Sequence, residues 1–123
     1  MDTLDVQQSQ RRKYDRMPIV VLCDISKPET GAILGRGCVL NFSKGGIAVV
    51  STAILPFMAT VNVNVDGLDQ KGFIPVRVVN DRLVLDELHA YGLQFEGFNP
   101  FDRAQIVRKF RRLFRILVNT GPS

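Results

Sequence analysis

The sequence predicts a mainly β protein, a small antiparallel barrel or sandwich of six strands followed by one C-terminal amphipathic helix. Short apolar or alternating runs recur about every 10 to 15 residues up to residue 97, and turn residues separate them. The apolar spacing then changes from every second residue to steps of three and four. With 123 residues, 46% of them hydrophobic and 23% charged, the chain has the size and composition of one globular domain.

The first three strands are expected at 18–24, 32–42 and 47–51. The first run is rich in β-branched residues, and a Ser-Lys-Pro-Glu-Thr-Gly cluster typical of a turn separates it from the second. Because Gly45 and Gly46 lie between the second and third runs, these two strands are expected to form a hairpin.

The fourth and sixth expected strands alternate most clearly. In "TVNVNVDGLD", residues 60–69, valine occupies every second position before an Asp-Gly turn, and in "AYGLQFEG", residues 90–97, Tyr, Leu and Phe do the same. The fifth strand, at 72–80, contains Pro75. Proline cannot donate to a strand ladder, so this position predicts an edge strand or a bulge.

A helix is expected at about 100–118. Asn99 followed by Pro100 is a typical helix start, Asp102 falls in the first turn, and Gly121-Pro122 ends the pattern. The helical apolar stripe consists of Ile106, Val107, Phe110, Leu113, Phe114 and Leu117. We expect this stripe to close one end of the barrel, which leaves the helix's arginines as a solvated face or a contact surface for a partner or a membrane.

The domain organisation follows from these elements. We expect a flexible N-terminal tail at 1–10, one domain at 11–118 with its barrel at about 17–97, and a short tail at 119–123. Neither a signal peptide nor an apolar run long enough to span a membrane is present, which predicts a soluble, cytoplasmic protein.

Charge is concentrated at the two ends of the domain. The net charge is +4, with +3 in residues 11–16 and +5 in residues 101–118, so the remainder carries −4. A basic balance of this kind favours anionic partners.

Catalytic and metal chemistry are poorly supplied. His89 is the single histidine and is expected to be structural or exposed, while Asp81 and the other loop carboxylates are expected in solvated turns. No CxxC motif occurs, and Cys23 and Cys38, both inside apolar runs, are expected to be buried and reduced. The sequence therefore predicts no enzyme, no metal and no cofactor.

Two stretches are candidates for binding an anion. In "QRRKYDRMPI", residues 10–19, Arg12 and Arg16 are four apart and share a side whether the segment is extended or helical. A guanidinium fork matches phosphate oxygens and the O6/N7 edge of guanine. The alternative is a solvated basic arm.

The second stretch is "NFSKGG", residues 41–46. Asn41 and Ser43 supply short polar side chains on one face, and Gly45 and Gly46 leave backbone N–H groups uncovered, so a base edge or a phosphate could be held there. The alternative is an ordinary turn in which Asn and Ser cap their own backbone.

Together, Arg-x-x-x-Arg ahead of the first strand and Asn-x-Ser-x-x-Gly between the second and third resemble the PilZ family. The "YGLQF" strand at 91–95 also looks like this family, and the resemblance covers roughly residues 11–97. It implies a six-stranded antiparallel PilZ-type β-barrel with a C-terminal helix, and a bacterial receptor for cyclic di-GMP.

The resemblance also implies roles for individual residues. Arg12 and Arg16 would contact phosphates and a guanine Hoogsteen edge, Asn41 and Ser43 would meet a guanine edge, and Gly46, next to Gly45, would permit close approach. Asn stands at position 41, where the family also commonly has Asp. Arg11 sits at a position linked in the family to whether one ligand or a stacked pair binds, and we expect a pair.

The resulting hypothesis is a stand-alone adaptor that regulates a protein effector. The segment 7–16 has little apolar surface, so we expect cyclic di-GMP to order this arm onto the barrel. Two rivals are a docking protein of the same fold that binds no nucleotide, and a small barrel that binds nucleic acid, for which exposed aromatic residues on a strand face would be expected.

Overall fold

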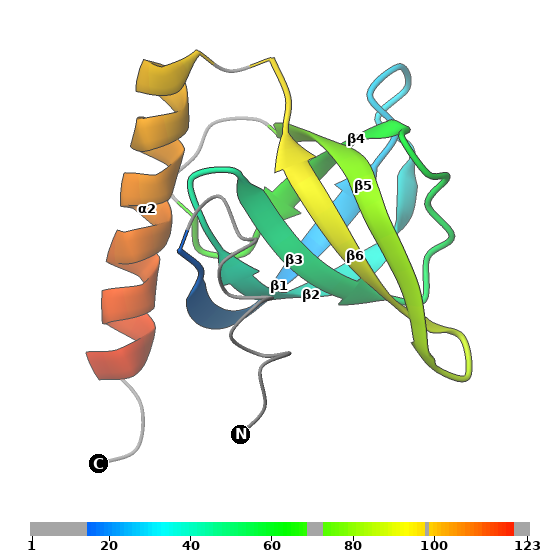
Figure 1. The fold of residues 1–123 in the computed structure, drawn as a ribbon, viewed down its shortest axis with the longest axis horizontal. Helices are drawn as coiled ribbons and strands as arrows, with labels where there is room; N and C mark the ends of the chain where they lie inside the picture. Colours follow the sequence, from blue (N-terminus) through cyan, green and yellow to red (C-terminus); the bar gives the residue numbers. More distant parts are fainter. Residues whose placement is uncertain (1–14, 69–72, 98, 120–123) are drawn as a thin grey trace, which may run out of the picture.

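The computed structural model describes residues 15–68, 73–97 and 99–119. These ranges contain the predicted helix and every predicted strand except residue 72, the first of the predicted fifth strand. The elements are β1 (Met17–Ser26), β2 (Ile33–Phe42), β3 (Gly46–Ser51), β4 (Thr60–Val65), β5 (Ile74–Leu85), β6 (Leu88–Phe95) and α2 (Pro100–Asn119). All strand pairs are antiparallel and close into a barrel in the order β1-β2-β3-β6-β5-β4. The six-stranded antiparallel barrel with a C-terminal helix is therefore confirmed (Figure 1).

The barrel interior is built by the alternation that the sequence shows. Along β4 the three valines are buried while the polar residues between them face outward. On β6, Tyr91, Leu93 and Phe95 are buried in the same way. Irregularities in the β1–β2, β2–β3 and β5–β6 ladders bend the strands, as closure of a small barrel requires.

The helix α2 packs beside the barrel and completes its core. Asn99 caps it, since its side-chain oxygen accepts a hydrogen bond from the Asp102 N–H at 2.8 Å. Four residues of the predicted stripe are buried against the barrel: Ile106, Val107, Phe110 and Leu113. The Phe110 ring stacks on Phe42 at the end of β2, with 5.1 Å between ring centroids.

Pro75 does not lie on an edge strand, because β5 pairs with both β4 and β6 in a closed barrel. Its carbonyl accepts a hydrogen bond from the Glu96 N–H at 3.0 Å, just beyond the end of β6. The N and C=O of one residue point to the same side of a strand, so the missing donor faces the place where β6 has ended. The two ladder irregularities of β5 lie instead between Val78 and Asn80 and between Leu83 and Leu85.

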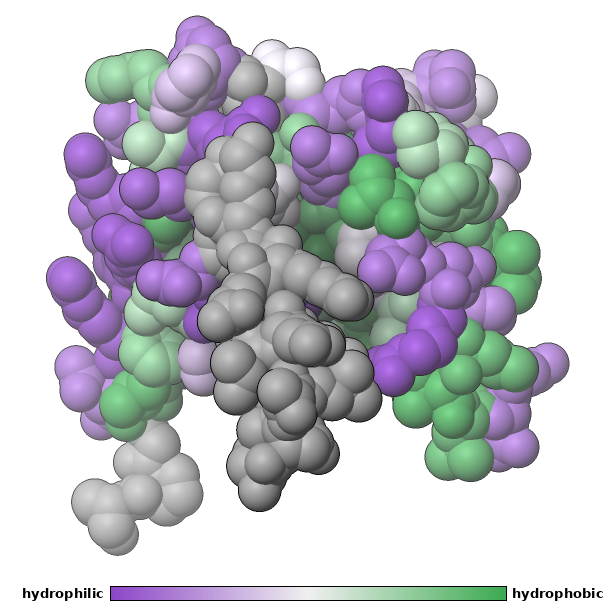
Figure 2. All heavy atoms as spheres, viewed as in Figure 1, coloured by the Kyte–Doolittle hydropathy of each residue, from purple (hydrophilic) through white to green (hydrophobic). Residues whose placement is uncertain are grey.

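The strand β5 also runs past its predicted end at residue 80, as far as Leu85. Its last seven residues are exposed on both faces, so apolar alternation could not reveal them. Asp81 therefore lies in a strand rather than a turn, where its carboxylate is 2.8 Å from His89 Nδ1. Figure 2 shows the hydrophobic surface at the far end of this β5–β6 hairpin, where Leu83, Val84 and Leu85 are exposed.

The two cysteines differ in environment, and both are free thiols. Cys23 faces the core, is 0% exposed, and its burial raises the pKa of the thiol to about 12. Cys38 lies between the inward-facing Gly37 and Val39, so it points outward and is only partly buried. Burial was thus predicted correctly for Cys23 and incorrectly for Cys38.

Candidate functional site

The turn between β2 and β3 carries the Asn-x-Ser-x-x-Gly motif and is held by its own hydrogen bonds. The Ser43 N–H donates to the Gly46 carbonyl at 2.9 Å, and the Ser43 hydroxyl oxygen accepts from the Gly45 N–H at 3.1 Å. The Phe95 N–H donates to the Gly45 carbonyl at 3.0 Å and ties the turn to β6. Ser43 therefore caps its turn, while its hydroxyl proton is still available as a donor.

Asn41 lies at a break in the ladder between β2 and β3. The register shifts between Val39 and Asn41, and Asn41 pairs with Ala48 across the two strands. The Asn41 side chain is partly buried, and it has no hydrogen bond to the part of the chain that the structure describes. Its amide can therefore both donate to and accept from a ligand.

Beside this turn lies a cavity of about 250 Å³, formed on the outer face of three neighbouring strands. Five predicted site residues line it together: Arg16, Asn41, Ser43, Gly45 and Gly46. The remaining lining residues are Ile47 and Ala48 of β3, Val79 and Asn80 of β5, and Gly92, Leu93 and Gln94 of β6. Arg11 and Arg12 fall outside the described residues.

Small residues make the floor of this cavity. Gly92 pairs with Ala48 on one side and with Asn80 on the other. A Cβ atom on Gly92 would lie 2.9 Å from the Asn80 Cβ, so the two strands leave no room for a side chain there. A glycine inside a strand often marks such a close approach, and this was the sequence feature that could have pointed to β6 as part of the site.

Gly46 is also required by the barrel itself. A Cβ atom at this position would lie 1.9 Å from the Leu93 carbonyl oxygen of β6. The absence of a side chain thus lets β3 approach β6, which is a structural reason for glycine in addition to the predicted approach of a ligand.

The charge of the cavity is one-sided. Arg16 is its single charged lining residue among those the structure describes, and no carboxylate lines it. Three amide side chains, those of Asn41, Asn80 and Gln94, add donors and acceptors around it. This combination suits an anion that also carries hydrogen-bonding edges.

Nothing in the cavity resembles a catalytic arrangement. His89, which pairs with Asp81, stacks on the Tyr91 ring at 5.4 Å between centroids and does not line the cavity. Within residues 15–68, 73–97 and 99–119, no group of three His, Cys, Asp or Glu side chains could hold a metal. Over the same ranges, no helix is long and apolar enough to cross a membrane.

Several solved structures share this fold at low sequence identity. The PilZ domain with c-di-GMP of YcgR from Escherichia coli matches with a TM-score of 0.58 and 17% identity, covering 91% of this chain and all (100%) of that one. The Klebsiella pneumoniae MrkH–c-di-GMP complex matches with a TM-score of 0.66 and 15% identity, covering 91% of this chain and 56% of that one.

The inhibitor of motility MotI/DgrA from Bacillus subtilis matches with a TM-score of 0.57 and 22% identity, covering 91% of this chain and 53% of that one. This chain thus spans about half the length of MrkH and MotI/DgrA. No curated protein matches the sequence.

The family comparison covers most of the chain. The family model described as "PilZ domain" matches residues 10–112, which include both predicted binding motifs, all six strands and most of α2. The chain therefore belongs to the PilZ domain family.

Proposed function

We propose that this chain is a cyclic di-GMP receptor that acts as an adaptor, binding the dinucleotide in the cavity beside the β2–β3 turn and regulating a partner protein. The observation that carries this proposal is the convergence of Arg16, Asn41 and the 43–46 turn on one cavity whose described lining residues include no carboxylate. Members of this family serve as receptors or adaptors, and two of the solved structures contain c-di-GMP.

The chemistry of the lining fits one half of such a ligand. Arg16 would pair with a phosphate or with guanine O6 and N7, because its guanidinium presents a fork of donors. The amides of Asn41, Asn80 and Gln94 would read the guanine edge, since each offers both a donor and an acceptor. The turn at 43–46 would contribute the Ser43 hydroxyl.

Arg11 and Arg12 extend this proposal to the N-terminal arm. Together with Arg16, Arg11 and Arg12 would give the site two more cations and help to neutralise the four phosphate charges of a stacked ligand pair. A titration that saturates at two ligands per chain supports the pair, and saturation at one contradicts it. Amide exchange at residues 10–17 should slow on binding, and unchanged exchange in a saturated sample argues against an ordered arm.

Nucleic-acid binding is less well supported. Stacking on single strands needs aromatic rings on an exposed strand face. The exposed phenylalanines of the described residues, Phe57, Phe73 and Phe101, lie instead in a loop, just before β5 and at the start of α2.

The experiment that tests the proposal is a calorimetric titration with cyclic di-GMP, cyclic di-AMP and a single-stranded oligonucleotide. Saturable binding of cyclic di-GMP alone is expected, because guanine differs from adenine at the edge that the amides face. Asn41→Ala should weaken it about tenfold, from the loss of one hydrogen-bonding group worth about 1 to 1.5 kcal/mol. The matched control is Asn64→Ala, an exposed position on β4 outside the cavity. Equal binding of all three ligands would reject the proposal.

A further inference from the structure

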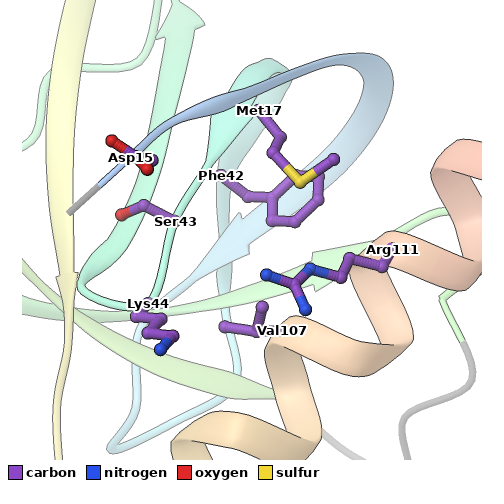
Figure 3. A pocket seen from close by; sticks show the side chains of 7 residues that line it. All are labelled: Asp15, Met17, Phe42, Ser43, Lys44, Val107 and Arg111. Atoms are coloured by element: carbon purple, nitrogen blue, oxygen red, sulfur yellow. The ribbon is translucent and has the colours of Figure 1, made fainter.

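A second, larger cavity of about 480 Å³ lies on the other side of the β2–β3 turn, between the turn and α2. Figure 3 shows its lining, which consists of Asp15, Met17, Phe42, Ser43, Lys44, Val107 and Arg111. Ser43 lines both cavities, whereas Arg16, Asn41, Gly45 and Gly46, the other predicted ligand residues that the structure describes, do not line this one. The second cavity is therefore a separate space that shares one wall with the first.

The floor of the second cavity is apolar and fixed. Phe42 is 0% exposed and stacks on Phe110 of α2, so the ring is held from below. Val107 on α2 and Met17 at the start of β1 complete the apolar surface around it. Phe42 and Val107 are 0% and 4% exposed, so the apolar surface open to an incoming side chain is that of Met17, which strand and helix hold in place from below.

Two cationic side chains also line this cavity. Lys44 comes from the β2–β3 turn and Arg111 from α2, and Figure 3 shows the Arg111 guanidinium directed from the helix toward the side of the cavity where Lys44 lies. Both side chains are exposed, and neither has an ion pair with the residues that the structure describes. Asp15 lies across the cavity from Arg111, next to Ser43 (Figure 3).

The positive charge continues along α2. Arg108 and Arg115 lie three residues before and four residues after Arg111, which places all three on one side of the helix. The outer surface over α2 is largely hydrophilic in Figure 2. An approaching acidic group is thus attracted along the helix toward the cavity.

We propose that this second cavity docks an acidic segment of a partner protein. A large apolar or aromatic side chain would pack against Met17, above the buried Phe42 and Val107, and a neighbouring carboxylate would pair with Lys44 and Arg111. A concave apolar floor under two cations matches one apolar side chain beside one carboxylate, whereas the surface of a bilayer is flat. The partner role rests on the proposed adaptor function, but the docking chemistry stands on this cavity alone.

The two cavities are physically linked. Arg16 lines the first cavity, while its neighbours Asp15 and Met17 line the second. A ligand that draws Arg16 inward therefore moves groups on the wall of the docking cavity, and Ser43 is common to both. Ligand and partner are then expected to change each other's affinity by the same factor, since linkage is reciprocal.

The test uses the full chain, labelled with ¹⁵N and free of nucleotide. It is titrated with the peptide Glu-Glu-Phe-Glu-Glu and, in parallel, with Lys-Lys-Phe-Lys-Lys and Glu-Glu-Gly-Glu-Glu. We expect saturable amide shifts around Lys44, Val107 and Arg111 with the first peptide, and at least fivefold weaker binding of the other two. Equal binding of all three peptides, or shifts elsewhere on the protein, overturns the proposal.

Matched charge reversals locate the site. Arg111→Glu should abolish the shifts, whereas Arg115→Glu removes the same charge from the same helix outside the cavity and should weaken binding by less than threefold. Equal losses overturn the proposal. Binding to a membrane is tested with vesicles of phosphatidylcholine and phosphatidylglycerol (7:3). If the protein sediments with these vesicles but does not bind the acidic peptide, the docking proposal is also overturned.

A repeat of the titration with saturating cyclic di-GMP tests the link between the cavities. A change of about fivefold or more in peptide affinity is expected, and an unchanged affinity in a ligand-saturated protein rejects the link. If cyclic di-GMP does not bind at all, the proposed function fails while the peptide result in the free protein still decides the docking site.

Discussion

Replacing Gly46 with alanine should destabilise the barrel through one defined steric conflict. The new Cβ would lie 1.9 Å from the Leu93 carbonyl oxygen and 2.9 Å from the Gln94 Cα. Both are backbone atoms of β6 in register with β3, so neither can rotate away. Overpacking costs about 1 to 3 kcal/mol, and a backbone obstacle places this variant near 3. Alanine also restricts the unfolded chain, which offsets about 0.4 to 1 kcal/mol and leaves a net loss of about 2 kcal/mol.

Equilibrium urea unfolding of Gly46→Ala measures this loss. The matched control is Gly31→Ala, the same chemical change in the β1–β2 turn, where φ is 74° and no atom lies within 4 Å of the added Cβ. Its cost comes from the left-handed backbone alone, about 1 kcal/mol after the same offset. A loss of stability in Gly46→Ala no larger than that in Gly31→Ala would rule out the steric conflict with β6.

Three further predictions concern the cysteines and Tyr91. A thiol reagent at pH 8 should modify Cys38 in the folded protein and Cys23 only after unfolding; simultaneous modification would contradict the assigned burial. Burial raises the folded-state pKa of Cys23 from 9.0 to about 12. The neutral thiol therefore stabilises the folded state fully below about pH 9, and this stabilisation, at most about 4 kcal/mol, is lost as the pH rises toward 12. Cys23→Ala should therefore flatten the alkaline fall in unfolding free energy, and an unchanged slope argues against it. Tyr91→Phe should cost about 2 to 4 kcal/mol in urea unfolding, since the hydroxyl donates to the Ala53 carbonyl at 2.7 Å and accepts from the Leu55 N–H at 3.1 Å. A loss below about 0.5 kcal/mol would show that water replaces these bonds.

The elements with one-sided burial could be predicted from the sequence. β4 and β6 each bury one face, so their alternation gives both the strand and its inward side. The helix start at Asn99 was predictable because its cap is a local interaction. The outer half of β5 was not, because no face of residues 80–85 is buried and the segment is held through its pairing with β6.

The candidate site was predictable only in part. Asn41, Ser43 and the two glycines lie within six consecutive residues at and around one hairpin turn, so their proximity follows from the sequence. Asn80 and Gln94 join them through strand pairing across the barrel, and sequence spacing does not show which strands become neighbours. The second cavity could not be predicted from the sequence for the same reason, since its lining residues come from the β2–β3 turn, the start of β1 and α2.

The proposed function depends on the binding of cyclic di-GMP by a guanidinium pair and the β2–β3 turn. Its most direct test is calorimetry on the wild type, on Arg12→Ala/Arg16→Ala, and on the charge-matched Arg108→Ala/Arg115→Ala. Loss of two charged hydrogen-bonding groups, each worth about 1.5 kcal/mol or more, predicts at least about 100-fold weaker binding for the first double variant. The second should stay within about threefold of the wild type, because screened surface charges at a distance contribute little. Absence of saturable binding to the wild type, or equal losses in the two double variants, would contradict the proposed function.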